Sequence, residues 1–143
     1  MNSTKQNIKK YGWESVYVFD EKGNKAPFSY SIGFEETFKH PEIMMFGLAR
    51  ETMHGILSDI AAGLKKGIIY PINKRVSKVI TAEYDVVFKE INEKYFSDYL
   101  GTAVTYYQKP FRAMVMFWPD KNNAFPFESH CEVSNQDEAL DII

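Results

Sequence analysis

The sequence predicts an α+β fold, in which a mainly antiparallel sheet or a small split barrel is flanked by two main helices. Several short segments are rich in β-branched and aromatic residues, two longer segments carry a helical apolar stripe, and strands and helices do not alternate regularly along the chain. That irregular order favours α+β over a doubly wound parallel sheet. The 143 residues fit a single domain. We expect its core over about residues 11–128 and a tail over 129–143 that is mobile or forms one short amphipathic turn.

The first third of the chain predicts a short helix and the first strands. Residues 2–11 are compatible with a helix that turns Ile8 and Tyr11 inward, and "ESVYVFD" (14–20) is typical of a strand. A further strand is expected at "PEIMMFGL" (41–48), because a proline at a strand start lacks only an N–H that need not be paired there.

Between these strands lies the most regular period-two pattern of the sequence. In "FSYSIGF" (28–34) large apolar residues alternate with Ser29, Ser31 and Gly33. The small, polar face of this strand has two interpretations. It is the solvent face of an antiparallel strand, or it lets a flat ligand or another backbone approach closely.

The long helix is expected from Ala49 to Lys66, because apolar residues recur there at helical spacing and Gly67 stands where a C′ glycine would. The next segments, "VSKVI" (76–80) and "EYDVVFKEI" (83–91), read as two strands or one bent strand.

A second helix is expected from Glu93 to Gln108, with Asn92 as its N-cap. The segment "FRAMVMFW" (111–118) is apolar on both faces except for Arg112, which is typical of a strand covered on both sides. Asp120 to Asn123 suit a turn, after which the residues around Pro126 predict a returning edge strand.

Composition excludes some classes of protein. There are 17 basic and 19 acidic residues, a formal net charge of −2, with no block of five or six like charges, so nucleic acid is not an expected partner. The one cysteine, Cys131, cannot form an intrachain disulfide, and no apolar run approaches the length of a membrane span. We therefore expect a cytoplasmic protein that does not insert into membranes.

No strong catalytic signature occurs. The three histidines, His40, His54 and His130, are scattered, which favours solvated surface histidines over a metal site. Arg50 and His54 share one face at the start of the long helix, where a phosphate or carboxylate could bind. The alternative is that Arg50 is a boundary residue paired with Glu51 or another acid, with its stem packed on its neighbours. The candidate ligand-binding residues are Trp13, Tyr30, Ser31, Glu42, Arg50, His54, Trp118 and Asp120.

Five motifs in one order carry a family resemblance. They are Gly12-Trp13, "PFSYSIGF", "HPEIMMFGL", "HGILSDIAAGLKKG" and "FWPDKNNAFPFE". Over about residues 11–128 this resembles the bacterial family of domain of unknown function 4262, to which no function is attached. Departures from its pattern are Ser31 for Thr, Phe34 for Leu, Ser58 for Asn and Phe127 for Trp. The matching positions are Trp13, Pro27, Tyr30, Gly33, Pro41, Glu42, Gly47, Leu48, Ile56, Leu57, Gly67, Trp118, Pro119, Asp120, Phe125 and Pro126.

A looser resemblance, to flavin reductase-like split barrels, implies a small-ligand-binding domain whose cofactor would be FMN. The second hypothesis is a non-enzymatic interaction module, such as an immunity or regulatory protein with a protein partner. A homodimer fits both hypotheses. A third hypothesis, a hydrolase using Glu42, His54 and Asp120, has no support from residue spacing.

Overall fold

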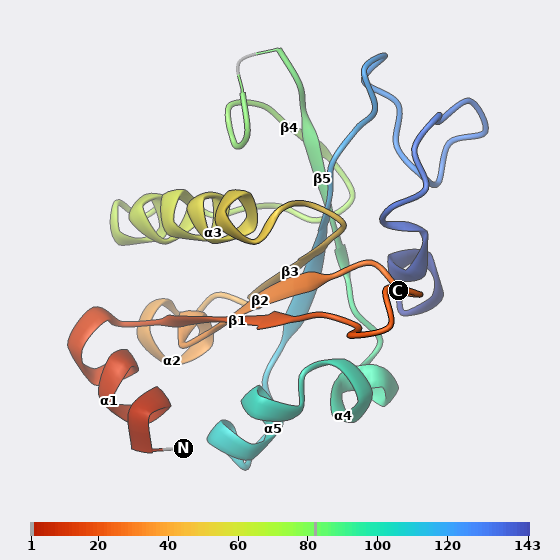
Figure 1. Cartoon of the computed structure of the whole chain (residues 1–143). Coiled ribbons are helices and arrows are strands. Elements are labelled where there is room, and N and C mark those ends of the chain that lie inside the picture. The colour runs from red at the N-terminus through yellow and green to blue at the C-terminus, as the bar shows by residue number, and fades with distance from the viewer. Residues whose placement is uncertain (1, 82) are drawn as a thin grey trace.

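The computed structural model describes residues 2–81 and 83–143, and six strands within them form one open sheet in the order β1-β2-β3-β6-β5-β4 (Figure 1). Neighbouring strands are antiparallel, except that β3 and β6 are parallel. The α+β prediction is confirmed, and of its two architectures the open, mainly antiparallel sheet is the one found. The strands are β1 (Glu14–Val18), β2 (Phe28–Ile32), β3 (Glu42–Phe46), β4 (Arg75–Val76), β5 (Val86–Glu90) and β6 (Ala113–Phe117).

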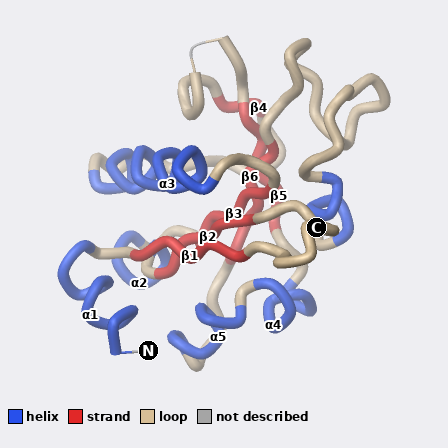
Figure 2. The backbone as a smooth tube through the Cα atoms, viewed as in Figure 1, coloured by secondary structure: helices blue, strands red, loops and turns tan. Residues whose placement is uncertain are grey.

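Helices cover both faces of this sheet. Figure 2 shows α3 on one side of the strands and α4 and α5 on the other. The central strands β3 and β6 are buried on both faces, as predicted for residues 111–118. No helix in the described residues combines the length and apolar character needed to cross a bilayer. The helices are α1 (Asn2–Tyr11), α2 (Phe34–Phe38), α3 (Arg50–Lys65), α4 (Phe96–Tyr99) and α5 (Gly101–Tyr107), with 3₁₀ turns η1 (Glu93–Tyr95) and η2 (Asp137–Asp141).

The helix α3 follows its sequence signals closely. Its apolar stripe is buried against the sheet, and Gly67 adopts φ 89° just beyond its end. The N–H of Ile68 donates to Gly63 O at 3.0 Å, and the N–H of Gly67 donates to Leu64 O at 3.0 Å. These two bonds form a Schellman motif, so the predicted C′ role of Gly67 is confirmed.

The strand β2 departs from the favoured prediction. It ends at Ile32, and both of its faces are covered, with Ser29 2% and Ser31 0% exposed. The solvent-face interpretation is therefore wrong, because α3 packs over the serine side of β2. Since protein fills this side, it offers no open face on which a flavin ring could lie.

The helix predicted over 93–108 begins as the 3₁₀ turn η1, which continues directly into α4, and a non-helical residue, Leu100 (φ −115°, ψ 37°), separates α4 from α5. Its N-cap is confirmed, since Asn92 Oδ1 accepts from the N–H of Lys94 at 3.1 Å. At the N-terminus, α1 buries Ile8 as predicted, whereas Tyr11 is exposed and its expected inward orientation is wrong.

The returning edge strand predicted after the Asp120 turn is also wrong, since the described residues 124–143 contain no strand. The Asp120 carboxylate instead curls this segment by accepting from the N–H groups of Asn122, Ala124 and Glu132. Further along, Gln136 bonds through its side chain to both the N–H and the carbonyl of Trp118. The tail thereby packs beside the end of β6.

Candidate functional site

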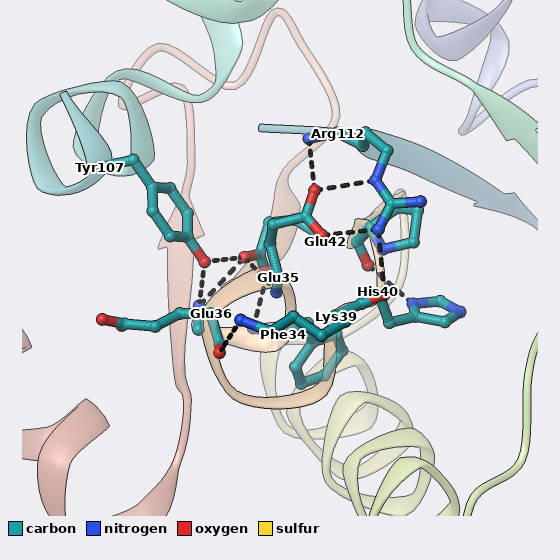
Figure 3. Close-up of polar contacts among 10 residues, drawn as sticks. Phe34, Glu35, Glu36, Lys39, His40, Glu42, Tyr107 and Arg112 are labelled. Atoms are coloured by element: carbon teal, nitrogen blue, oxygen red, sulfur yellow. Dashed lines mark hydrogen bonds and ion pairs between the residues drawn. The ribbon is translucent and has the colours of Figure 1, made fainter. Parts of the chain in front are cut away.

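A carboxylate at the first residue of β3 is enclosed by the protein. Glu42 is 1% exposed, and its two oxygens accept hydrogen bonds from five donors. Figure 3 shows Tyr107 of α5 pointing at this carboxylate, with the backbone of α2 beside it. The donors are the Ser31 hydroxyl (2.7 Å), the backbone N–H groups of Gly33, Phe34 and Glu35 (3.1 Å each), and the Tyr107 hydroxyl.

This arrangement depends on the turn that follows β2. Gly33 adopts φ 115°, a conformation that L side chains rarely adopt, and it directs three successive N–H groups to one point. The same residue is the N-cap of α2 but has no side chain with which to cap it. The carboxylate of Glu42 supplies that cap from the neighbouring strand, so it joins β2, α2, β3 and α5.

Burial is the main electrostatic influence at this centre. It raises the pKa of Glu42 to about 7, although the hydrogen bonds, that of Tyr107 first among them, oppose the shift. Burial and the neighbouring carboxylate also raise the pKa of the Tyr107 phenol. Nearby, Arg112 Nη2 lies 2.6 Å from Glu35 Oε2, and this bond lowers the pKa of Glu35 (Figure 3). The Glu42 centre is a closed structural junction, and the pKa of its carboxyl group lies near neutral pH.

An open hollow of about 480 Å³ lies elsewhere, between α1, β1 and α3. Ser15 Oγ and His54 Nδ1 are 2.8 Å apart in it, a hydrogen bond between β1 and α3. The Trp13 ring is stacked on the His54 imidazole, with centroids 5.8 Å apart and planes at 24°. Its lining residues are Asn7, Tyr11, Trp13, Glu14, Ser15, His54 and Ser58.

The eight candidate residues do not form one site. Ser31 and Glu42 meet in the buried junction, and Trp13 and His54 meet in the open hollow. Arg50 lies one helical turn from His54, but its guanidinium stacks over the Tyr17 ring at 5.1 Å. Arg50 therefore contacts an aromatic ring of β1, whereas the expected alternative was a pair with an acid.

The other three candidates hold the fold together. The Tyr30 hydroxyl accepts from the N–H of Thr102 at 3.2 Å, and Trp118 Nε1 donates to Phe46 O at 2.7 Å. Asp120 organises its turn as described above, and those backbone bonds lower its pKa. His40 is buried against Tyr70, so the expectation of a solvated side chain is wrong for this histidine.

Two residues of these sites were not among the candidates. Ser15 lies between Trp13 and Tyr17 in the alternation of β1, on the side that faces α3, and that alternation is the signal that could have identified it. Tyr107 lies in the segment expected as the second helix, and no local pattern reveals its bond to a residue 65 positions away. The described residues contain no group of three or more His, Cys, Asp or Glu side chains that could hold a metal ion.

Comparison with known proteins identifies the family. The family model of domain of unknown function DUF4262 matches residues 7–132. The chain belongs to the DUF4262 family. No curated protein and no solved structure matches it significantly. In this DUF4262 protein the motif positions Gly33 and Glu42 lie in the buried junction, whereas the motif position Trp13 lies in the open hollow.

Proposed function

We propose that this DUF4262 protein binds a small ligand with a flat ring, neutral or cationic, in the hollow between α1, β1 and α3. The observation that carries the proposal is the Ser15–His54 hydrogen bond together with the Trp13 ring stacked on His54. Ligand sites commonly combine aromatic side chains with a few polar groups that fix orientation, and this hollow has both.

The charge of the lining supports a neutral or cationic ligand. Glu14 contributes a carboxylate, oriented by a 2.7 Å hydrogen bond from Asn7 Nδ2. The described lining residues include neither Lys nor Arg. A flavin ring fits this requirement, but the phosphate of FMN would be repelled by Glu14. Riboflavin, which has the ring without the phosphate, is therefore the flavin expected to bind better.

The test uses the two tryptophans as reporters. Titration with riboflavin, FMN, adenosine and glucose is followed by tryptophan fluorescence. We expect at least one neutral ring compound to quench Trp13, and Trp13→Phe to abolish the change because Trp118 lies in another part of the fold.

His54→Ala should weaken binding about tenfold, the effect of losing one hydrogen bond and one stacking contact. The matched control, His130→Ala, removes an exposed histidine outside the hollow. If no compound quenches Trp13, or if His54→Ala binds like the wild type, the proposal is wrong.

A second candidate function is protein interaction, which exposed isoleucines favour. Ile68, Ile69 and Ile72, in the loop after α3, are 49%, 80% and 41% exposed. Such grouped apolar side chains commonly mark association surfaces.

For this candidate we expect a homodimer in light-scattering measurements of molar mass. Ile69→Asp should convert it to a monomer, because a charge in an apolar interface loses its hydration. Ile143→Asp, at an exposed isoleucine of the C-terminus, is the matched control and should leave the dimer intact. A monomeric wild type at every concentration would exclude self-association through this loop.

A further inference from the structure

The Ser15–His54 pair has the geometry of an activated nucleophile. Ser15 Oγ and His54 Nδ1 are 2.8 Å apart, the separation at which imidazole accepts a hydroxyl proton. The imidazole is held by the Trp13 ring, which itself packs on Phe34 with centroids 5.5 Å apart. Both polar side chains face an open hollow rather than the core. We propose that Ser15 is a nucleophile activated by His54, and that the hollow hydrolyses small carboxylic esters of flat-ring alcohols or phenols.

The reaction balances with water as the only co-reactant. Ser15 Oγ attacks the ester carbonyl carbon while its proton passes to His54 Nδ1. The new Oγ–C bond remains, the bond from carbon to the leaving oxygen breaks, and His54 returns the proton to that oxygen. Water then attacks the acyl group on Ser15 with His54 as base, which releases the carboxylic acid and restores the serine hydroxyl.

The lining of the hollow suits such an ester. The proposed ester hydrolysis rests on the ligand site proposed above. Trp13 and Tyr11 provide aromatic surface for a ring-shaped leaving group. Ser58 lies one helical turn beyond His54 and lines the same hollow, so its hydroxyl is available as a donor to the ester carbonyl oxygen. An uncharged ester also avoids repulsion by Glu14.

The experiment measures acylation of Ser15 directly. p-Nitrophenyl acetate is mixed with the whole chain, p-nitrophenolate release is followed, and the acetylated peptide is mapped by mass spectrometry. We expect an initial burst, an acetyl group on Ser15 Oγ, and slow turnover. Ser15→Ala should show neither burst nor adduct at that position, and His54→Ala should slow acylation about 100-fold or more. A fluorophosphonate probe should label Ser15 of the wild type in the same way.

Matched controls are Ser97→Ala, at an exposed serine of α4, and His130→Ala, and both should react like the wild type. Adducts that map to other residues, or equal burst rates in the wild type and Ser15→Ala, would overturn the inference. Quenching of Trp13 by a ring compound without any Ser15 adduct would overturn the nucleophile alone and leave the ligand site standing. Absence of both quenching and adduct would overturn both.

Discussion

Replacing Glu42 by Gln is expected to lower the free energy of unfolding by about 1–3 kcal/mol near pH 5. An amide has one acceptor oxygen, whereas both oxygens of a carboxyl group accept hydrogen bonds, even when one of them carries a proton. Two of the five donors bond to Oε1 and three bond to Oε2. Whichever way the amide is oriented, its NH₂ group faces at least one backbone N–H that cannot turn away, that of Phe34 or that of Glu35. An unsatisfied donor of this kind costs about 1–3 kcal/mol. Urea unfolding followed by circular dichroism measures the difference.

The same variant should reveal the titration of Glu42. Burial raises the pKa of this carboxyl from 4.5 to about 7 in the folded protein. The folded state therefore binds this proton more tightly than the unfolded state, and the resulting stability is present below pH 4.5 and is lost as the pH rises through about 7. Glutamine does not titrate. The gap in unfolding free energy between wild type and Glu42→Gln should narrow by up to about 3 kcal/mol between about pH 5 and about pH 8.

The matched control is Glu36→Gln, which changes the exposed carboxylate bonded to Tyr106. Since an exposed polar contact contributes little, this change should alter stability by less than about 1 kcal/mol. A gap that widens with rising pH for Glu42→Gln would mean that the five donors outweigh burial and that the pKa of Glu42 lies below its usual value.

How far the sequence predicts this fold depends on how local each signal is. The strand around Tyr30 and the helix α3 were predicted because period-two and helical patterns repeat within single segments. The helix α2, which starts after Gly33, has five residues, and a helix of that length is too short to show a periodic pattern. The prediction of an edge strand around Pro126 is wrong because three backbone N–H groups bond to the Asp120 carboxylate and curl the chain there.

The candidate sites were less predictable, because they are made by contacts between distant segments. Ser15 and His54 are 39 positions apart, and they meet only because β1 lies beside α3. Glu42 was a candidate ligand-binding residue, next to Pro41 in the sequence. Its role as the cap of α2 depends on the positive φ of Gly33. In the sequence pattern, Gly33 is visible only as a small residue of a strand.

Replacing Gly33 by Ala should destabilise the protein by about 3 kcal/mol or more. A Cβ at this position would lie 2.6 Å from Gly12 O and 2.8 Å from Trp13 Cα, and these are backbone atoms that cannot rotate away. The φ of 115° adds strain for any L side chain. The two effects contribute about 1–3 and 1–2 kcal/mol respectively. Thermal and urea unfolding measure the sum.

Gly55→Ala is the opposite case in the same chain and serves as the control. Gly55 lies within α3, and beyond the backbone of its own helix no atom comes within 4 Å of the position that an alanine Cβ would take. Alanine should therefore stabilise the helix by about 0.5–1 kcal/mol. If Gly33→Ala were as stable as the wild type, that result would contradict the close approach of the turn after β2 to the backbone of Gly12.

The Gly33 variant also tests how the buried junction is connected to the open hollow. Any movement that accommodates the new methyl group displaces the backbone of Gly12 and Trp13, so ligand quenching at Trp13 should weaken. Glu42→Gln acts on the other side of the same turn, where the N–H of Gly33 donates to the carboxylate. Because both changes strain one turn, their effects on unfolding free energy should not be additive in the double variant. Ligand binding by folded Glu42→Gln should remain close to that of the wild type, because Glu42 does not line the hollow.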